Sequence, residues 1–190
     1  MNSTSIRAVM LNIRAKKDSS QVIKSLEIKK GNTIADIGSG GGYFTFEFSK
    51  IIGTAGKVFA VDTNQKFLSH INKILKRDKI QNIKIVISNE NRCPLPNTSY
   101  DLIFMRNVFH HITSPINYFK NIKNCIKPGC KIAIIEWLPT NIKWRYVGFP
   151  GHCTQENEIQ KIMLDAGFMH LKSFNFLKRE SFNIFQKQSL

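Results

Sequence analysis

The sequence of this 190-residue chain lacks the features that mark several classes of protein. No run of 18 apolar residues is present, so we expect no membrane-spanning helix. The apolar stretch at residues 8–11 is too short for the core of a signal peptide. The four cysteines form no C-x-x-C pair and have no histidine pair at zinc spacing, so we expect reduced thiols and no bound metal. These absences together predict a cytoplasmic protein.

Acidic residues are also scarce, with 13 Asp and Glu against 28 Lys and Arg, which gives a net charge of +15. An excess of this size suggests an anionic partner such as nucleic acid, a membrane surface or an acidic metabolite. The lysines are dispersed along the chain, however, and form no long block of like charge. Because dispersed charge is weaker evidence than a basic stripe, we expect a diffuse basic surface without specific nucleic-acid binding.

What the sequence does contain is an alternation of apolar, strand-like runs with amphipathic helical patterns. Residues 1–18 are polar and basic and predict a loose tail or a fragment of a cap, whereas residues 19–190 are long enough for one domain. Strands that alternate with helices indicate parallel β-α-β units. We expect strands near residues 33–35, 57–61, 83–87, 102–105, 132–135, 168–174 and 181–185, and helices near residues 21–26, 43–52, 65–76, 115–125 and 155–166.

One short segment carries most of the functional information. The run Asp-Ile-Gly-Ser-Gly-Gly-Gly at residues 36–42 follows directly after the first apolar strand, and Asp62 closes the second strand 20 residues after Gly42. Glycine permits positive φ angles and lets a ligand lie against the main chain. A carboxylate at the tip of the next strand can accept hydrogen bonds from two ribose hydroxyls. This pair of features predicts a nucleoside-binding site.

The spacing of the glycines indicates which nucleoside-containing ligand to expect. A dinucleotide site has the pattern G-x-G-x-x-G, but the position three residues after Gly40 is Tyr43, which disfavours a pyrophosphate. The pattern in this chain, an acid followed by alternate glycines, is the one expected for S-adenosylmethionine (SAM). The alternative is another Rossmann-like domain that binds NAD or a nucleotide.

Five segments in a fixed order extend this assignment beyond the glycine turn. They are residues 34–44, 60–62, 94–101, 108–112 and 126–130. In order and spacing they resemble the class I SAM-dependent methyltransferases from about residue 22 to the end, and the last third of the chain resembles small bacterial methyltransferase-domain proteins. The resemblance implies an α/β, Rossmann-like fold with a mostly parallel seven-stranded sheet and an antiparallel closing strand. It also implies SAM as the cofactor and S-adenosylhomocysteine as the product.

The resemblance assigns cofactor contacts to residues at the ends of the first two strands. It implies that the main chain of Gly38, Gly40 and Gly42 lies against the methionine and ribose parts of SAM. Asp36 is expected to help position the amino end of the cofactor, although it could also cap the glycine turn. Asp62 is expected to bind the ribose hydroxyls.

Two further cofactor contacts are implied less directly. Where the family commonly has an acid for the adenine amino group, this sequence has Asn89. An amide oxygen can still accept a hydrogen bond from an amino group; alternatively, Glu90 takes this role. Arg106 begins the segment that forms, in the family, the wall between cofactor and acceptor, and it is included among the cofactor-binding candidates.

The candidate catalytic residues are three histidines. His110 and His111 follow the fourth predicted strand, and His152 lies in a loop near residues 139–154, which we expect over the carboxyl edge of the sheet. Histidine titrates near neutral pH and could orient or deprotonate an acceptor. The alternative is that these histidines only pack or lie near helix ends. Glu136 and Trp137, at the end of the fifth strand, complete the expected acceptor wall.

Methyl transfer from a sulfonium requires alignment and exclusion of water rather than a protein nucleophile. The sequence lacks the Asn-Pro-Pro-Tyr and Pro-Cys runs that two classes of nucleic-acid methyltransferase carry after the fourth strand. We therefore expect methyl transfer to a small-molecule acceptor. The net charge keeps an RNA- or ribosome-directed methyltransferase as the alternative, and a SAM-binding protein without catalysis is a second alternative.

Overall fold

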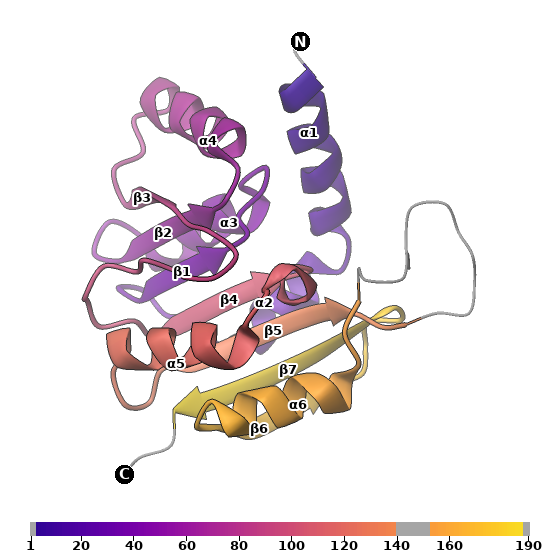
Figure 1. Ribbon diagram of the computed structural model, residues 1–190. Coiled ribbons are helices and arrows are strands. Elements are labelled where there is room, and N and C mark those ends of the chain that lie inside the picture. Colours follow the sequence, from indigo (N-terminus) through magenta and orange to yellow (C-terminus); the bar gives the residue numbers. More distant parts are fainter. Residues whose placement is uncertain (1–2, 140–152, 188–190) are drawn as a thin grey trace. The chain divides into compact units, whose positions relative to one another are not determined.

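The computed structural model describes residues 3–139 and 153–187 of the chain, which divides into two compact units, Met1–Asn89 and Glu90–Leu190. Helices and strands alternate through both units (Figure 1). The first unit contains the glycine turn and Asp62, and the second contains the adjacent histidines. Within the described residues, no helix combines the length and the apolar character needed to cross a membrane.

The first unit is built on three parallel strands. These are β1 (Thr33–Ile37), β2 (Lys57–Asp62) and β3 (Ile83–Ile87). β2 pairs in parallel with both β1 and β3. Parallel neighbours need crossover connections, and these are the helices α3 (Tyr43–Ile52) and α4 (Gln65–Arg77), each in contact with the strands it joins. Because Ile37 is level with Val61, the glycine turn after β1 and Asp62 at the end of β2 emerge at the same edge.

Apolar periodicity explains how these helices cover the strands. Phe44, Phe48 and Ile52 are buried at positions i, i+4 and i+8 of α3, and Ile71 and Leu75 are buried at i and i+4 of α4. Such spacing puts the side chains on one face of a helix. β1 and β2 are buried almost along their whole length, as expected for parallel strands covered on both faces.

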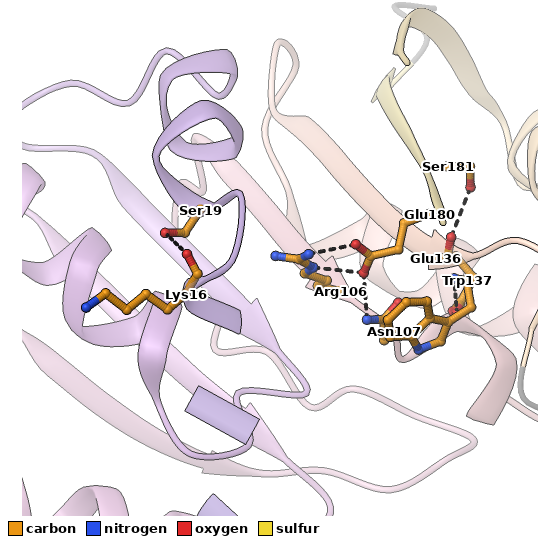
Figure 2. Close-up of polar contacts among 8 residues, drawn as sticks. All are labelled: Lys16, Ser19, Arg106, Asn107, Glu136, Trp137, Glu180 and Ser181. Atoms are coloured by element: carbon orange, nitrogen blue, oxygen red, sulfur yellow. Dashed lines mark hydrogen bonds and ion pairs between the residues drawn. The ribbon is translucent and has the colours of Figure 1, made fainter. Parts of the chain in front are cut away.

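The N-terminal segment, expected as a loose tail or a fragment of a cap, forms a helix that packs on the first unit. α1 (Ser3–Lys16) contacts α3 and α4 and buries Ala8 completely, and α2 (Ser19–Ser25) follows. The Ser19 hydroxyl donates to the main-chain carbonyl of Lys16 at 2.8 Å (Figure 2), and its Oγ lies 2.8 Å from the Tyr43 hydroxyl. The residues before β1 are therefore built into this unit.

The second unit combines parallel and antiparallel strands. Its strands are β4 (Leu102–Arg106), β5 (Lys131–Trp137), β6 (Phe168–Phe174) and β7 (Glu180–Lys187). β4 and β5 pair in parallel, whereas β7 is antiparallel to both β5 and β6. Its helical segments are η1 (Phe109–His111), α5 (Pro115–Cys125) and α6 (Glu156–Asp165). The pairing of Trp137 with Glu180 places the end of β5 beside the start of β7.

The predicted fold class is confirmed. The described residues contain seven strands, of which β1 to β5 are parallel wherever they pair within a unit and the closing pair, β6 and β7, is antiparallel. Every strand and helix expected from the sequence is present, with small shifts at the ends. The expectation of a single domain over residues 19–190 stays a prediction.

Candidate functional site

The glycine turn connects β1 to α3 through three residues with positive φ. Gly38, Gly40 and Gly42 have φ angles of 74°, 52° and 87°. The N–H groups of Gly38 and Ser39 donate to the carbonyl of Val61 at 2.8 and 3.0 Å. The turn is thus tied to the last residues of β2, and its main chain lies beside the carboxylate that ends that strand.

The glycines of the turn differ in what a side chain would meet. A Cβ at Gly41 would lie 2.4 Å from the Ala8 carbonyl oxygen, and a Cβ at Gly42 would lie 2.8 Å from the Phe46 ring. Other protein atoms therefore occupy the space that a side chain at Gly41 or Gly42 would need. At Gly40, by contrast, the nearest described atom to a Cβ would be Cδ1 of Leu11 at 3.4 Å, an ordinary contact distance. A Cβ at Gly40 would therefore meet no clash, but the positive φ of 52° still favours glycine at this position.

Asp62, at the end of β2, is 9% exposed and is held by main-chain donors. Its Oδ2 accepts from the N–H of Gly40 and its Oδ1 from the N–H of Asn64, both at 2.8 Å. Burial raises the pKa of Asp62, and the main-chain hydrogen bonds oppose that rise. A carboxylate has about four acceptor positions. The N–H of Thr63 is a third main-chain donor to this carboxylate. The carboxylate can still accept one more hydrogen bond, and a ribose hydroxyl is a suitable donor.

Asp36, in β1, is 3% exposed and accepts a hydrogen bond from the Thr45 hydroxyl at 2.5 Å. Burial raises the pKa of Asp36 to about 7; the Thr45 hydrogen bond opposes the rise, and the negative charge of Asp62 adds to it. A nearby cation would favour the ionised form of this carboxyl. SAM carries two cationic groups, its ammonium and its sulfonium, so this buried acid suits SAM.

The hydroxyl of Ser39 gives a further test of the fit to SAM. Its Oγ is buried, and among the described residues it has no hydrogen-bond partner. Buried polar atoms are nearly always hydrogen-bonded, so this atom is suited to contact a ligand. One strand edge thus offers two carboxylates, a glycine main chain and a buried hydroxyl, and this set of groups fits SAM.

The two candidates for the adenine contact follow β3. The N–H of Ser88 donates to the carbonyl of Asp62 at 3.0 Å, so the chain leaves β3 beside the end of β2. Asn89, which is exposed, ends the first unit, and Glu90, also exposed, opens the second. The choice between Asn89 and Glu90 stays a prediction.

One contact of the glycine turn was missed by the sequence analysis. Asn12 of α1 donates from Nδ2 to the carbonyl of Gly41 at 3.0 Å, and its Oδ1 accepts from the N–H of Tyr43 at 3.2 Å. The second bond satisfies one of the N–H groups that have no partner within the first turn of α3. One sequence feature could have indicated this contact. Asn12 comes four residues after the small Ala8, so both lie on the same face of a helix, and that face can pack closely on another segment.

Arg106, a predicted cofactor contact, is bound to an acid of the same unit. Its Nε and Nη2 donate to the two carboxylate oxygens of Glu180 at 2.9 and 2.6 Å (Figure 2). The two side chains are 10% and 6% exposed, and Nδ2 of Asn107 also donates to Glu180, at 2.8 Å. Such two-point pairs fix geometry as well as charge. The pair fastens the end of β4 to the start of β7, which the sequence analysis did not foresee.

His110, in η1, lies against a fully buried carboxylate. Its Nδ1 is 2.8 Å from Oε1 of Glu136, and its main-chain N–H donates to Oε2 at 3.2 Å. Oε1 of Glu136 also accepts from the N–H of Trp137 at 2.7 Å. With a proton on Nδ1, the ring would donate to this carboxylate, and Nε2 would be the acceptor of that tautomer. This arrangement orients the ring in the manner of a histidine–carboxylate base.

Of the other two histidines predicted to contact the acceptor, only His111 lies within the described residues. His111 is exposed, and its ring centroid lies 4.1 Å from that of His110. His152 and most of the loop near residues 139–154 lie outside the described residues. Among residues 3–139 and 153–187, no group of three or more His, Cys, Asp or Glu side chains is arranged to hold a metal ion.

Comparison with known proteins agrees with these features. A family model described as a methyltransferase domain matches residues 28–183. The chain is 25% identical over 111 residues to the ubiquinone/menaquinone biosynthesis C-methyltransferase UbiE of Azotobacter vinelandii, a match that covers 58% of this chain and 44% of that protein. For the protein of the same name from Hahella chejuensis the identity is 28%, over 60% of this chain and 47% of the relative. The chain spans less than half the length of these curated relatives.

The chain is also similar to proteins of solved structure. A SAM dependent methyltransferase from Aquifex aeolicus has a TM-score of 0.83 and is 26% identical, with 97% of this chain and 98% of that chain covered. The [4+2]-cyclase SpnF has a TM-score of 0.74 at 10% identity, with 90% and 82% covered; at this identity it shows the fold alone. Because one fold hosts different chemistries, the assignment depends on the family match and the residues of the turn. On both grounds, the chain belongs to the class I SAM-dependent methyltransferase family.

Proposed function

We propose that this methyltransferase transfers the methyl group of SAM to a small organic acceptor by direct displacement. The observation that carries the cofactor half of the proposal is the pair of buried carboxylates, Asp36 and Asp62, on either side of the glycine turn. The curated relatives support the acceptor half, because they are named as methyltransferases of ubiquinone and menaquinone biosynthesis, which are small-molecule pathways.

In this proposal, the first unit supplies most of the cofactor contacts. Asp62 accepts a hydrogen bond from a ribose hydroxyl while Gly40 and Asn64 hold its carboxylate in place. The main chain of Gly38, Gly40 and Gly42 lies against the methionine and ribose parts, and Asp36 balances the positive charge of the cofactor. Asn89 or Glu90 accepts from the adenine amino group.

The second unit contributes the groups that act on the acceptor. Bound SAM would supply a methyl group on a sulfonium: the acceptor's electron pair would bond to the methyl carbon as the carbon–sulfur bond breaks, and that bond's electrons would stay on sulfur in S-adenosylhomocysteine. Where the acceptor loses a proton, Nε2 of His110 is the base, held in position by Glu136. His111 and His152 are proposed to line the acceptor side. The cofactor contact expected for Arg106 stays a prediction; its guanidinium pairs with Glu180.

A labelling experiment tests the proposal. Purified protein is incubated with methyl-labelled SAM and, separately, with the small-molecule fraction and the RNA fraction of a cell extract. We expect label in the small-molecule fraction, and we expect Asp62→Asn to lose it while Asp78→Asn, an exposed acid of the same unit, keeps it. The net charge of +15 favours RNA as the second candidate acceptor. Label in RNA alone would replace the small-molecule proposal.

A further inference from the structure

α1 presents a stripe of apolar side chains to solvent. Ile6, Val9, Met10 and Ile13 are 49%, 40%, 66% and 68% exposed. Their spacing of i, i+3, i+4 and i+7 puts them on one face of the helix. Only four other large apolar side chains are exposed in the described part of the chain, and they are spread over other elements. Scattered exposed apolar residues are ordinary, whereas a contiguous patch marks an interaction surface.

Cations flank this apolar stripe, and α1 has no acid. At about 100° per residue, Arg14 projects from one side of the stripe and Lys16 from the other, and both are exposed. Arg7 lies on the same side as Arg14, and its guanidinium is 5.9 Å from the centre of the Phe67 ring in α4. The helix sequence from Ser3 to Lys16 contains neither Asp nor Glu. A helix with one apolar face bordered by Lys and Arg is typical of helices that lie in the interface of a membrane.

The opposite face of α1 is occupied by the glycine turn. Ala8 is fully buried, its carbonyl oxygen would lie 2.4 Å from a Cβ at Gly41, and Asn12 hydrogen-bonds to Gly41 and Tyr43. The apolar stripe therefore points away from the turn. A partner can cover the stripe while α1 keeps its contacts with the cofactor-binding loop.

We propose that α1 docks the protein on an anionic lipid bilayer, with the apolar stripe in the interfacial region and the flanking cations on lipid phosphates. A bilayer of this kind supplies apolar depth and negative charge along the whole helix, which matches both features of the face. The net charge of +15 adds a longer-range attraction to the same surface. Docking brings the glycine turn to about one helix diameter, roughly 10 Å, from the lipid, and it requires neither SAM nor an acceptor.

Vesicle sedimentation of the full chain tests this proposal. The vesicles contain phosphatidylcholine alone, or equal parts of phosphatidylcholine and phosphatidylglycerol, at about 150 mM salt. We expect binding to the anionic vesicles and at least about tenfold less to the neutral ones. We expect the double variant Met10→Asn, Ile13→Asn to lower binding by about tenfold or more. Its matched control is Leu164→Asn, which changes an apolar side chain of α6 that is 59% exposed.

A second pair of variants tests the cations. Arg14→Gln with Lys16→Gln should lower binding by about tenfold, whereas Lys73→Gln with Lys76→Gln, on exposed positions of α4, should leave it nearly unchanged. All substituted side chains are exposed, so circular dichroism should show wild-type folding. Failure of the wild type to bind, equal binding to both vesicles, or equal loss in the controls would overturn the proposal. Self-association that disappears in the stripe variant, without vesicle binding, would assign the stripe to a second copy of the chain and would equally overturn it.

Discussion

The two units bury their acidic side chains in different ways. In the first unit, Asp36 and Asp62 accept hydrogen bonds from a hydroxyl and from main-chain N–H groups, which carry no net charge. In the second, the carboxylate of Glu180 faces the guanidinium of Arg106. Neutral donors satisfy the oxygens but leave the negative charge for a ligand to balance. An arginine balances the charge within the protein, and the pair then serves to hold strands together.

The raised pKa of Asp36 is a consequence of its burial without a cationic side chain as a partner among the described residues. Burial raises it to about 7 because the ionised carboxyl is poorly solvated, and in this part of the chain no cationic side chain lowers the value. A cationic cofactor is the kind of group that such a site lacks. The comparison teaches that an uncompensated buried acid indicates where a charged ligand binds, and a compensated one indicates how the architecture is fastened.

The largest expected effect is on the compensated pair. Glu180→Ala leaves the guanidinium of Arg106, 10% exposed in the wild type, without its carboxylate, and we expect the free energy of unfolding to fall by about 3 kcal/mol. Urea denaturation followed by circular dichroism measures this. Glu47→Ala is the control, since it removes an ion pair with Lys50 whose lysine is 71% exposed, which should contribute little. Equal losses for both variants would contradict a structural role for the buried pair.

The next effect concerns Asp36 and pH. The folded protein keeps a proton on Asp36 up to about pH 7, whereas the unfolded chain releases it near pH 4. The wild type therefore loses stability as pH rises through this window. Asn does not titrate, so we expect Asp36→Asn to be more stable than the wild type at about pH 8, by about 1.4 kcal/mol for each unit by which the folded-state pKa is raised, and by little at about pH 4.

Denaturation curves at several pH values test this expectation. Asp78→Asn, at an exposed position on the C-cap of α4, is the control and should show no such pH-dependent gain. A gain for Asp36→Asn that is the same at every pH would show that the folded-state pKa of Asp36 is ordinary.

The third effect is on cofactor affinity. Asp62→Ala removes the acceptor proposed for a ribose hydroxyl, and we expect the affinity for S-adenosylhomocysteine to fall by about tenfold or more. Isothermal calorimetry measures this, with Asp78→Ala as the control. Unchanged affinity in Asp62→Ala, or tight binding of NAD by the wild type, would remove the assignment of this carboxylate to SAM.

The smallest effect expected is on the kcat of the enzyme when a histidine assigned to the acceptor is replaced. His111→Ala and His152→Ala should each lower kcat several-fold and leave the affinity for S-adenosylhomocysteine nearly unchanged, because they are assigned to the acceptor and not to the cofactor. The acceptor found by labelling is the substrate for this assay, and His70→Ala, in α4, is the control. A loss of affinity for S-adenosylhomocysteine with a normal kcat would contradict the assignment of these histidines to the acceptor.

The local part of the fold and of the site could be predicted from the sequence. Strands β1 and β2 are continuous apolar runs, and α3 and α4 show helical periodicity, so their positions follow from short-range patterns. The glycine turn and Asp62 could be found because each lies at the end of a strand and the two ends meet when parallel strands pair in register.

The contacts that were missed join distant parts of the chain. Arg106 and Glu180 are 74 residues apart, and their pairing depends on which strand lies beside β5 and in what register. Asn12 contacts the glycine turn from 29 residues away, and the basic character of its segment conceals that role. A single polar side chain has no periodicity that would reveal a partner in a distant part of the chain.

The sequence by itself determined the class of fold, the cofactor-binding turn and the acid that follows it, because each of these depends on the order and spacing of residues along one stretch of chain. Only the tertiary structure decided which buried acids have a cationic partner. It also decided that the face of α1 with Ala8 and Asn12 packs on the glycine turn and that the apolar stripe is exposed. These features depend on packing between segments that are far apart in the chain. Burial also decides the charge state of a carboxyl such as Asp36, since solvation is a property of the folded surroundings and not of the residue.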